Sequence, residues 1–404
     1  MQKTILSYLI IFFVTFFVYF GVGTKFTFQP KWQLDYFNLM AKSLQEFRLD
    51  IVNSGTTYDL VFYKDKWYAP WGVLPAVLLI PPQLVLGRFI PAFYLSILFA
   101  GLNAVVLYAL LQRVRREFFP KTSSVATLLT TVLFAFGTTH FYVGTLGSSW
   151  HVDQMVSSFL GTLGIFAIFK KERKIKDYIL SAILFAASLL GRPTFIMLMV
   201  LPFFLYVWEY FYKRKQKSVK VFLKMAAVFG IPVVLFSFLF FFYNYVRFEY
   251  PFEYGYRYIR ESAYLEQVRE RLGILSLSYI PINLWFMVFE IPRISLQEGR
   301  FFFNFNLVGN SIFFLTLPFL AAFLAPMRNH YILFLWLTTI VTILPSLMIY
   351  STGWMQFGYR YSLDITVLLI LLTFFGMRGK VNILYILGII VSICLYLWGI
   401  FTLM

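Results

Sequence analysis

The sequence has little cysteine and little charge. Its 404 residues include one cysteine, Cys394, so no disulfide can form within the chain and a disulfide-stapled scaffold is excluded. Charged residues make up 13% of the chain and hydrophobic residues 60%, which excludes two or three soluble domains. Disorder is excluded as well, because 50 phenylalanines are the opposite of a weakly hydrophobic composition. The chain is therefore expected to lie in a membrane.

Several catalytic and nucleotide-binding motifs are also missing. The sequence contains no G-x-x-x-x-G-K-[ST], no C-x-x-C and no H-E-x-x-H, and no G-x-G-x-x-G follows a suitable strand. ATP-driven transport and zinc proteolysis therefore lack their usual marks.

Long apolar runs predict an all-α, polytopic integral membrane protein. A helix needs about 20 apolar residues to cross the hydrocarbon core. We expect 1–404 to form a single membrane domain with about eleven transmembrane helices, the first being a retained span rather than a signal peptide. The eleven runs lie near 5–22, 90–112, 122–138, 154–169, 178–191, 194–211, 221–242, 310–326, 331–350, 365–376 and 381–402.

The basic loops orient these spans. If the proline-rich segment 69–87 does not cross, 19 basic and 4 acidic residues lie on the side of the N-terminus, which accounts for +15 of the net charge of +17. The positive-inside rule then makes the N-terminus cytoplasmic and 69–87 an interfacial or re-entrant helix. The basic composition thus reflects topology and anionic membrane lipids, so no nucleic-acid partner is expected. Two large outer loops, 24–89 and 243–309, are expected to contain interfacial helices.

Two acids stand just outside predicted spans. Asp35 opens a segment with helical apolar spacing, so it is either an acid complementing a helix dipole or a base at the rim of a cavity. Asp153 follows His151 between two apolar arms. It is either a solvated acid with His151 as hydrogen-bond partner or a group retained for function, because charge at membrane depth is costly. Two such ligands alone are a weak metal signal.

Three arginines are candidate anion-binding groups, because a guanidinium donates parallel hydrogen bonds to phosphate and keeps its charge. Arg192 and Arg360 stand beside apolar runs, and each can instead reach lipid headgroups. Arg257 lies among acids, which favours a self-paired, solvated loop.

The segments LDYFNLMAKSLQEFRLDI, YAPWGVLPAVLLIPP and GTLGSSWHVDQM together resemble the C-type polytopic glycosyltransferases. This superfamily includes protein O-mannosyltransferases, the aminoarabinose transferases of lipid A and the catalytic subunit of oligosaccharyltransferase; GRPTF and GWMQFGYRYSLD also resemble segments of uncharacterised bacterial relatives. Two departures are visible. The family's paired acids are reduced here to Asp35 followed by Tyr36, and His151 stands beside Asp153 in place of a second acid, so we expect no metal or other cofactor.

The resemblance implies transfer of a sugar from a polyprenyl-phosphate donor to a lipid, glycan or protein acceptor, at the outer face of a bacterial cytoplasmic membrane. Asp35 would be the general base of an inverting transfer. The predicted substrate-binding residues are Asp153, His151, Arg192, Arg360 and Arg257, and Trp67, Trp71, Trp150 and Trp354 offer either sugar platforms or an interfacial aromatic belt.

Two other classes of function remain open. A lipid or oligosaccharide flippase or secondary transporter would share the apolar spans, but charged residues are scarce in the middle of these spans. A noncatalytic assembly protein of the cell envelope would tolerate replacement of Asp35, whereas an enzyme would not.

Overall fold

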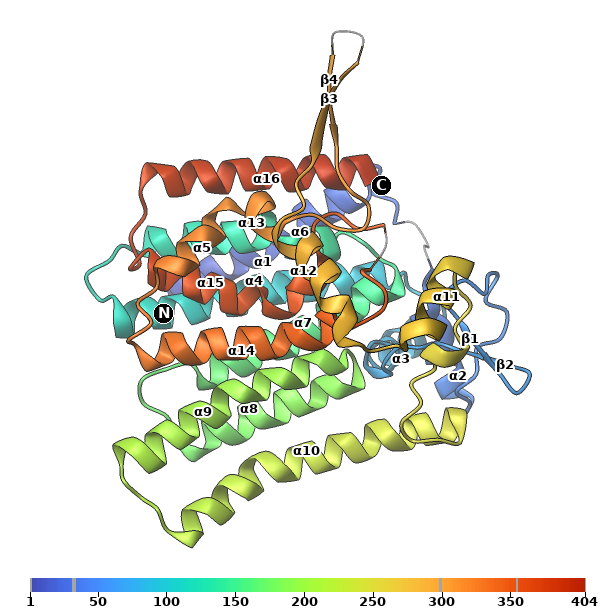
Figure 1. The fold of residues 1–404 in the computed structure, drawn as a ribbon, viewed down its shortest axis with the longest axis horizontal. Coiled ribbons are helices and arrows are strands. Elements are labelled where there is room, and N and C mark those ends of the chain that lie inside the picture. The colour runs from blue at the N-terminus through green and yellow to red at the C-terminus, as the bar shows by residue number, and fades with distance from the viewer. Residues whose placement is uncertain (1, 31–33, 298–299, 354, 404) are drawn as a thin grey trace. The chain divides into compact units, whose positions relative to one another are not determined.

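The computed structural model describes residues 2–30, 34–297, 300–353 and 355–403 (Figure 1). Helix accounts for 69% of the chain and strand for 4%, so the predicted all-α class is confirmed. The chain forms two compact units. Unit 1 comprises residues 1–15, 104–143 and 275–404, and unit 2 comprises residues 16–103 and 144–274. Helices α1 (Gln2–Gly23) and α4 (Phe93–Phe118) contribute residues to both units.

Six helices in the described part of the chain are long and apolar enough to cross a membrane, which makes this a multi-pass membrane protein. Helix α10 (Val219–Phe248) is typical, because exposed hydrophobic side chains such as Val234 and Phe238 suit a lipid neighbour. The six segments are Ile5–Gly23, Phe93–Phe118, Pro193–Lys213, Val219–Phe248, His330–Leu347 and Ile383–Leu403.

The other five predicted spans are helical, but they are too short or not apolar enough to be counted among the six helices that could cross a membrane. Helices α5 (Ser124–Phe136) and α8 (Ile175–Ala187) have 13 residues each, about 20 Å at 1.5 Å per residue. Helix α7 (Ser149–Ile168) is long enough, but its first turns are polar. The remaining two are α15 (Leu363–Gly376) and the pair α13 (Ile312–Leu315) and η6 (Leu317–Leu324). The count of eleven therefore stays a prediction.

Unit 1 is built around α15, whose residues from Leu363 to Phe375 are all buried. Helix α15 packs on η6 and on α14 (His330–Leu347), while α16 (Ile383–Leu403) packs on α5 (Figure 1). The contact with η6 is close: a Cβ atom on Gly376 would lie 1.8 Å from the carbonyl oxygen of Ala321. The unit also contains α6 (Thr139–Gly144), α12 (Ile280–Val288) and a hairpin of β3 (Arg293–Gln297) and β4 (Arg300–Asn304).

In unit 2, helix α8 packs against α7, α9 (Val200–Val207) and α10 (Val219–Phe248). Smaller elements gather at one end of these helices (Figure 1). They are α2 (Tyr36–Gln45), the hairpin of β1 (Val61–Tyr63) and β2 (Lys66–Tyr68), α3 (Leu74–Leu86) and α11 (Ala263–Leu272). The ranges 24–89 and 243–309 therefore contain helices, and their interfacial position stays a prediction. The hairpins β1–β2 and β3–β4 are elements that the sequence analysis did not predict.

Helix α3 forms within the ambiguous segment 69–87. It has 13 residues, starts with Pro75 in its first turn and ends at Gly87, whose φ of +62° suits glycine. At about 20 Å it is too short for a hydrocarbon core of about 30 Å. Its length therefore favours the interfacial or re-entrant interpretation. Helix α3 packs on α2 and α7, and the apolar residues of these three helices share one core.

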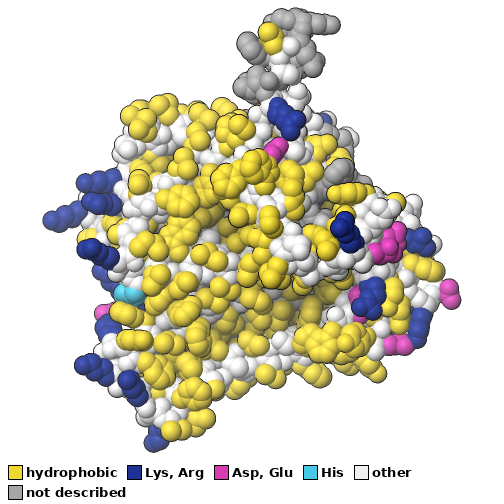
Figure 2. All heavy atoms as spheres, viewed as in Figure 1, with side chains coloured by type: hydrophobic (Ala, Val, Ile, Leu, Met, Phe, Trp, Pro, Cys, Tyr) yellow, Lys and Arg dark blue, Asp and Glu magenta, His cyan; other side chains and the backbone are white. Residues whose placement is uncertain are grey.

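Acidic side chains are unevenly distributed along unit 2. Lys and Arg side chains gather at the end where α9 turns into α10, whereas the end with β1–β2 and α11 carries Asp and Glu side chains together with further Lys and Arg (Figure 2). This uneven distribution, seen in the sequence, is the basis for orienting the chain in the membrane. Which end faces the cytoplasm stays a prediction.

Candidate functional site

Asp35 caps the start of α2, as the sequence predicted for a helix beginning at this acid. Its Oδ2 accepts hydrogen bonds from Asn38 Nδ2 at 2.7 Å and from the backbone N–H of Ala92 at 2.8 Å. Its Oδ1 accepts one long bond of 3.4 Å from the backbone N–H of Asn38. The carboxylate is thus held mainly through Oδ2, and Oδ1 keeps most of its capacity to accept a proton.

Burial raises the pKa of Asp35 from its ordinary value of 3.8 to about 6. The hydrogen bonds from Ala92 and Asn38 act in the opposite direction, but loss of solvation is the larger effect. A carboxyl group that titrates near neutral pH is suited to general base catalysis. The N-cap role and the raised pKa coexist in this one residue.

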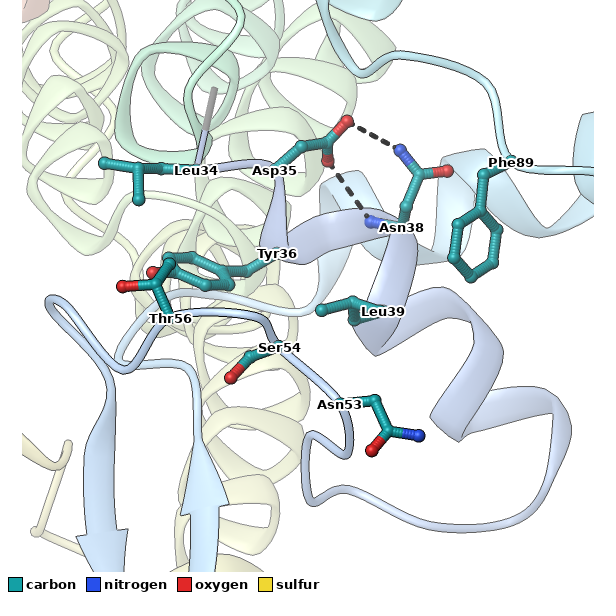
Figure 3. Close-up of a pocket in the computed structure, with 9 residues that line it drawn as sticks. All are labelled: Leu34, Asp35, Tyr36, Asn38, Leu39, Asn53, Ser54, Thr56 and Phe89. Atoms are coloured by element: carbon teal, nitrogen blue, oxygen red, sulfur yellow. Dashed lines mark hydrogen bonds between the residues drawn. The ribbon is translucent and has the colours of Figure 1, made fainter. Parts of the chain in front are cut away.

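A cavity of about 280 Å³ opens beside Asp35 (Figure 3). The close-up shows the Asp35 carboxylate turned toward Asn38, with Phe89 on the far side of Asn38. Backbone and side chains from α2, from the segment 53–56 and from the loop before α4 form the wall. The lining residues are Leu34, Asp35, Tyr36, Asn38, Leu39, Asn53, Ser54, Thr56 and Phe89.

A chain of buried amides holds Asn38 against Asp35. Asn38 Nδ2 also donates to the carbonyl oxygen of Ile90 at 2.7 Å. Gln83 Nε2 of α3 donates to Asn38 Oδ1 at 2.8 Å, and Gln45 Nε2 donates to Gln83 Oε1 at 2.8 Å. The sequence analysis missed these residues, although a glutamine inside the apolar segment 69–87 was a visible signal.

The start of α7 is hydrogen-bonded to the residues on both sides of Asp35. Ser149 Oγ accepts the backbone N–H of Tyr36 at 2.9 Å and donates to the carbonyl oxygen of Leu34 at 2.9 Å. Asp153 follows one turn later in α7, with 4% of its surface exposed. The two acids singled out in the sequence therefore belong to segments that are joined directly.

His151 lies in the same first turn of α7, with 5% exposure. Its Nδ1 is 2.5 Å from Ser148 Oγ, which occupies the N-cap position of α7. This contact engages Nδ1, and whether Nδ1 donates or accepts depends on the tautomer of the ring.

Arg192 approaches the same part of α7 through its backbone. Its N–H donates to Ser157 Oγ at 2.9 Å, and its side chain is half-buried. A Cβ atom on the preceding Gly191 would lie 3.1 Å from Asp153 Oδ1 and 2.4 Å from Ser157 Oγ. Glycine is therefore required for this close approach of the chain to Asp153.

Trp71 fills the space between the starts of α2 and α7. Its ring stacks on Tyr36 at 5.6 Å and lies 6.0 Å from the ring of Trp150. With 7% exposure, Trp71 is a core residue, so the sugar-platform interpretation does not hold for it. Trp354 lies outside the described residues.

The other two predicted arginines lie one in each unit. The side chain of Arg257 is 73% exposed and pairs with Glu253 at 3.8 Å, which agrees with the self-paired loop expected as the alternative. Arg360 belongs to unit 1, where its N–H donates to Gln356 Oε1 at 2.8 Å and its guanidinium lies 5.2 Å from the ring centroid of Tyr361.

Arg247, at the end of α10, is a buried cation that the sequence analysis missed. Its exposure is 2%, and it donates to the carbonyl oxygen of Ala69 at 2.6 Å and to Asn244 Oδ1 at 2.8 Å. Its guanidinium lies 3.8 Å from the ring centroid of Tyr243. Its Nε makes no hydrogen bond to the described residues, and burial disfavours the charged form of Arg247, although the charge of Glu253 acts in the opposite direction. A buried cation without a direct ion pair is costly and favours a nearby anion.

The side chain of Tyr254 interacts electrostatically with both Arg247 and Asp153. Burial, and next the negative charge of Asp153, raise the pKa of Tyr254 well above its ordinary value. The guanidinium of Arg247 lies 5.9 Å from the Tyr254 ring centroid. Acid, phenol and guanidinium therefore influence one another electrostatically within unit 2. Within the described part of the chain, no three His, Cys, Asp or Glu side chains are grouped to hold a metal ion.

Comparisons with known proteins give a match in fold alone. No protein-family model matches the sequence, and no curated protein matches it. Among solved structures, the chain superposes on ArnT from Cupriavidus metallidurans bound to undecaprenyl phosphate, with a TM-score of 0.51 and 12% sequence identity. The chain has the fold of ArnT. The resemblance to the C-type glycosyltransferases, to which ArnT belongs, is thus confirmed at the level of the fold. The match to ArnT covers 94% of this chain and 60% of ArnT.

Proposed function

We propose that this protein is a membrane glycosyltransferase that takes a sugar from a polyprenyl-phosphate donor. The observation that carries the proposal is that Ser149 hydrogen-bonds the segment of Asp35 to the helix that contains Asp153. The fold is shared with a protein whose structure was solved bound to undecaprenyl phosphate. Buried acids with small polar neighbours at the end of a helical bundle are what transfer to a hydroxyl group would need.

In the proposed reaction, Asp35 Oδ1 takes the proton of an acceptor hydroxyl while the oxygen of that hydroxyl attacks the anomeric carbon of the donor. The bond between that carbon and the phosphate oxygen breaks, and its electron pair leaves with the polyprenyl phosphate. Attack opposite to the leaving group inverts the anomeric carbon. Burial raises the pKa of the Asp35 carboxyl group, and this supports its role as base.

The leaving phosphate needs a cation to balance its developing charge. In unit 2, Arg192 and the buried Arg247 are the candidates, and the sequence adds Arg360 of unit 1. His151 and Asp153 would orient hydroxyl groups of the sugar, since they lie in the first and second turns of α7, whose start is hydrogen-bonded to the start of α2. The reaction would take place at the outer face of a bacterial cytoplasmic membrane.

The test is transfer by the purified full chain in lipid vesicles, with radiolabelled polyprenyl-phosphate sugars and a panel of lipid, glycan and peptide acceptors. The key variant is Asp35→Asn, because asparagine also caps helices well and so preserves the start of α2. Asp50→Asn is the matched control, since Asp50 lies outside the cavity and pairs with Arg48 at 3.0 Å.

We expect transfer by the wild type and by Asp50→Asn, and a loss of at least 100-fold in Asp35→Asn, the lower end of what removal of a general base costs, about 10²–10⁴-fold. Undiminished transfer by Asp35→Asn would remove Asp35 from its role. Labelled donor that crosses the vesicle without transfer would instead favour a flippase or transporter. Wild-type protein that neither transfers nor translocates any donor would contradict the proposal and leave a noncatalytic role.

A further inference from the structure

Among the described residues that line the cavity beside Asp35, one group is charged near neutral pH, and that group is negative. Asp35 is the acid; the other ionisable side chain, Tyr36, has its pKa raised to about 12 by burial and by the charge of Asp59. None of the described residues that line the cavity is lysine or arginine. The other polar side chains of the lining are uncharged: Asn38, whose amide is bonded to Asp35 and Gln83, and Asn53, Ser54 and Thr56.

The causes that shift the pKa of Asp35 are burial and the hydrogen bonds from Ala92 and Asn38, and no cation of the described residues is among them. The charge of Asp59 raises the pKa of the lining residue Tyr36, so a second negative charge acts near the cavity. Arg48, which follows α2, is bound to Glu46 at 2.5 Å and to Asp50 at 3.0 Å. An anion placed in the cavity would face the Asp35 carboxylate without compensation, in surroundings where charges are poorly screened.

The cavity is also small. Pockets for drug-sized ligands measure roughly 300–1,000 Å³, and this one is about 280 Å³. Its apolar wall includes Leu34, Leu39 and Phe89, which suit the C–H faces of a ring, while the amide and hydroxyl groups suit its hydroxyls.

We infer that this cavity binds a neutral, hydroxyl-bearing acceptor of about the size of one sugar ring, and that it discriminates against phosphorylated and carboxylated acceptors. The inference rests on the proposed function, in which Asp35 takes the proton of the acceptor. Asn53, Ser54 and Thr56 are then specificity-determining residues, because they offer hydrogen bonds without charge.

Binding can be measured without any transfer by chemical labelling of Asp35. A hydrophobic carbodiimide adds to protonated carboxyl groups, and at pH 6 about half of Asp35 should carry a proton. The full chain in phosphatidylcholine nanodiscs is treated at pH 6, and the modified Asp35 peptide is quantified by mass spectrometry. The probes are methyl hexopyranosides, hexose 6-phosphates and methyl hexuronides at equal concentration.

We expect the neutral methyl hexopyranosides to slow labelling at least threefold and the two anionic probes to leave it unchanged. Equal or stronger protection by an anionic probe would overturn the inference. Absence of protection by every probe would overturn it as well. Failure of Asp35 to react with the carbodiimide even without sugar would also overturn the inference, because a cavity open to a sugar must admit the reagent.

Variants of the wall refine the test. Asn53 has a φ of +57°, so Asn53→Gly removes its side chain without straining the backbone. Asn53→Gly and Thr56→Val should each raise the sugar concentration for half-maximal protection several-fold, whereas Thr57→Val, just outside the lining, should not. Thr56→Lys adds a cation and should let hexose 6-phosphate protect Asp35. Unchanged selectivity in all three cavity variants would place the sugar elsewhere.

The outcomes separate this inference from the proposed function. Selective protection by neutral sugars without transfer to any acceptor would retain the binding site and reject the glycosyltransferase. Transfer to phosphorylated acceptors, with protection by them, would retain the glycosyltransferase and reject the neutral site.

Discussion

Ser149 bridges the two residues that flank Asp35: its Oγ accepts the N–H of Tyr36 and donates to the carbonyl oxygen of Leu34, both at 2.9 Å. More than 110 residues of chain separate Ser149 from this segment. A single hydroxyl thus fixes the start of α2 against the start of α7, and with it the positions of the two helix-start acids.

The rate of transfer is expected to depend on one ionisation of Asp35. The base form is required, so transfer should rise with pH through a midpoint of about 6 and then level off. The measurement is initial rate against pH at saturating donor, with donor binding followed separately in the same buffers. A midpoint near 4, the value of an exposed aspartate, would show that burial does not tune this group.

Asn38→Ala should move that midpoint upward. The variant removes the 2.7 Å hydrogen bond from Nδ2 to Asp35, one of the interactions that lower the pKa of Asp35. It should also destabilise the protein by about 1–3 kcal/mol, because Gln83 loses its partner. Gln112→Ala, which removes a hydrogen bond to Tyr108 in unit 1, is the control that should leave the pH profile in place. Slower transfer with an unchanged midpoint of the pH profile would show that Asn38 has only a structural role.

Asp35→Asn should raise thermal stability at pH 8 although it abolishes transfer. The folded state holds the Asp35 proton with a pKa of about 6, against 3.8 when the group is exposed, so its charged form destabilises the fold once the pH rises through this window. The gain of the variant should therefore be absent near pH 4 and on the order of 1–3 kcal/mol above pH 6. Thermal unfolding of both proteins at several pH values checks this; a gain that does not change with pH would contradict it.

Gly72→Ala should impair both folding and transfer. A Cβ atom there would lie 2.2 Å from the carbonyl oxygen of Leu190 and 2.4 Å from that of Gly191, and neither backbone atom can move without displacing the chain beside Asp153. We expect a loss of about 1–3 kcal/mol. The matched control is Gly230→Ala in α10, where nothing lies within 4 Å of the added atom. Equal melting temperatures for the two variants would contradict the close packing of these segments.

Arg247→Met should weaken binding of polyprenyl phosphate at least tenfold while the protein stays folded. Methionine can fill the buried volume but provides no charge for the phosphate. Arg247→Lys, which keeps a charge, should retain part of the affinity, and Arg271→Met, at an exposed position of α11, should retain all of it. If Arg247→Met stays folded and binds polyprenyl phosphate like the wild type, Arg192 becomes the better candidate for the phosphate.

Much of the fold was predictable because apolar runs of helical length have few other possibilities in a membrane protein. The helix starting at Asp35 was equally visible, since Phe37, Met40 and Leu44 recur at helical spacing. The hairpin β1–β2 was not visible, because strands of three residues give no measurable alternation. The role of Arg247 was hidden as well, because an arginine at the end of an apolar run usually reaches the headgroups.

By itself the sequence determined that the chain is a helical, multi-pass membrane protein, and it singled out Asp35 and Asp153, because composition and local periodicity are properties of contiguous residues. Only the tertiary structure decided that the starts of α2 and α7 meet at Ser149, that Trp71 is enclosed by Tyr36 and Trp150, and that Arg257 is exposed. These relationships join residues far apart in the chain. They depend on which helices pack together, and that is set by the complementarity of whole helix surfaces rather than by any short stretch of sequence.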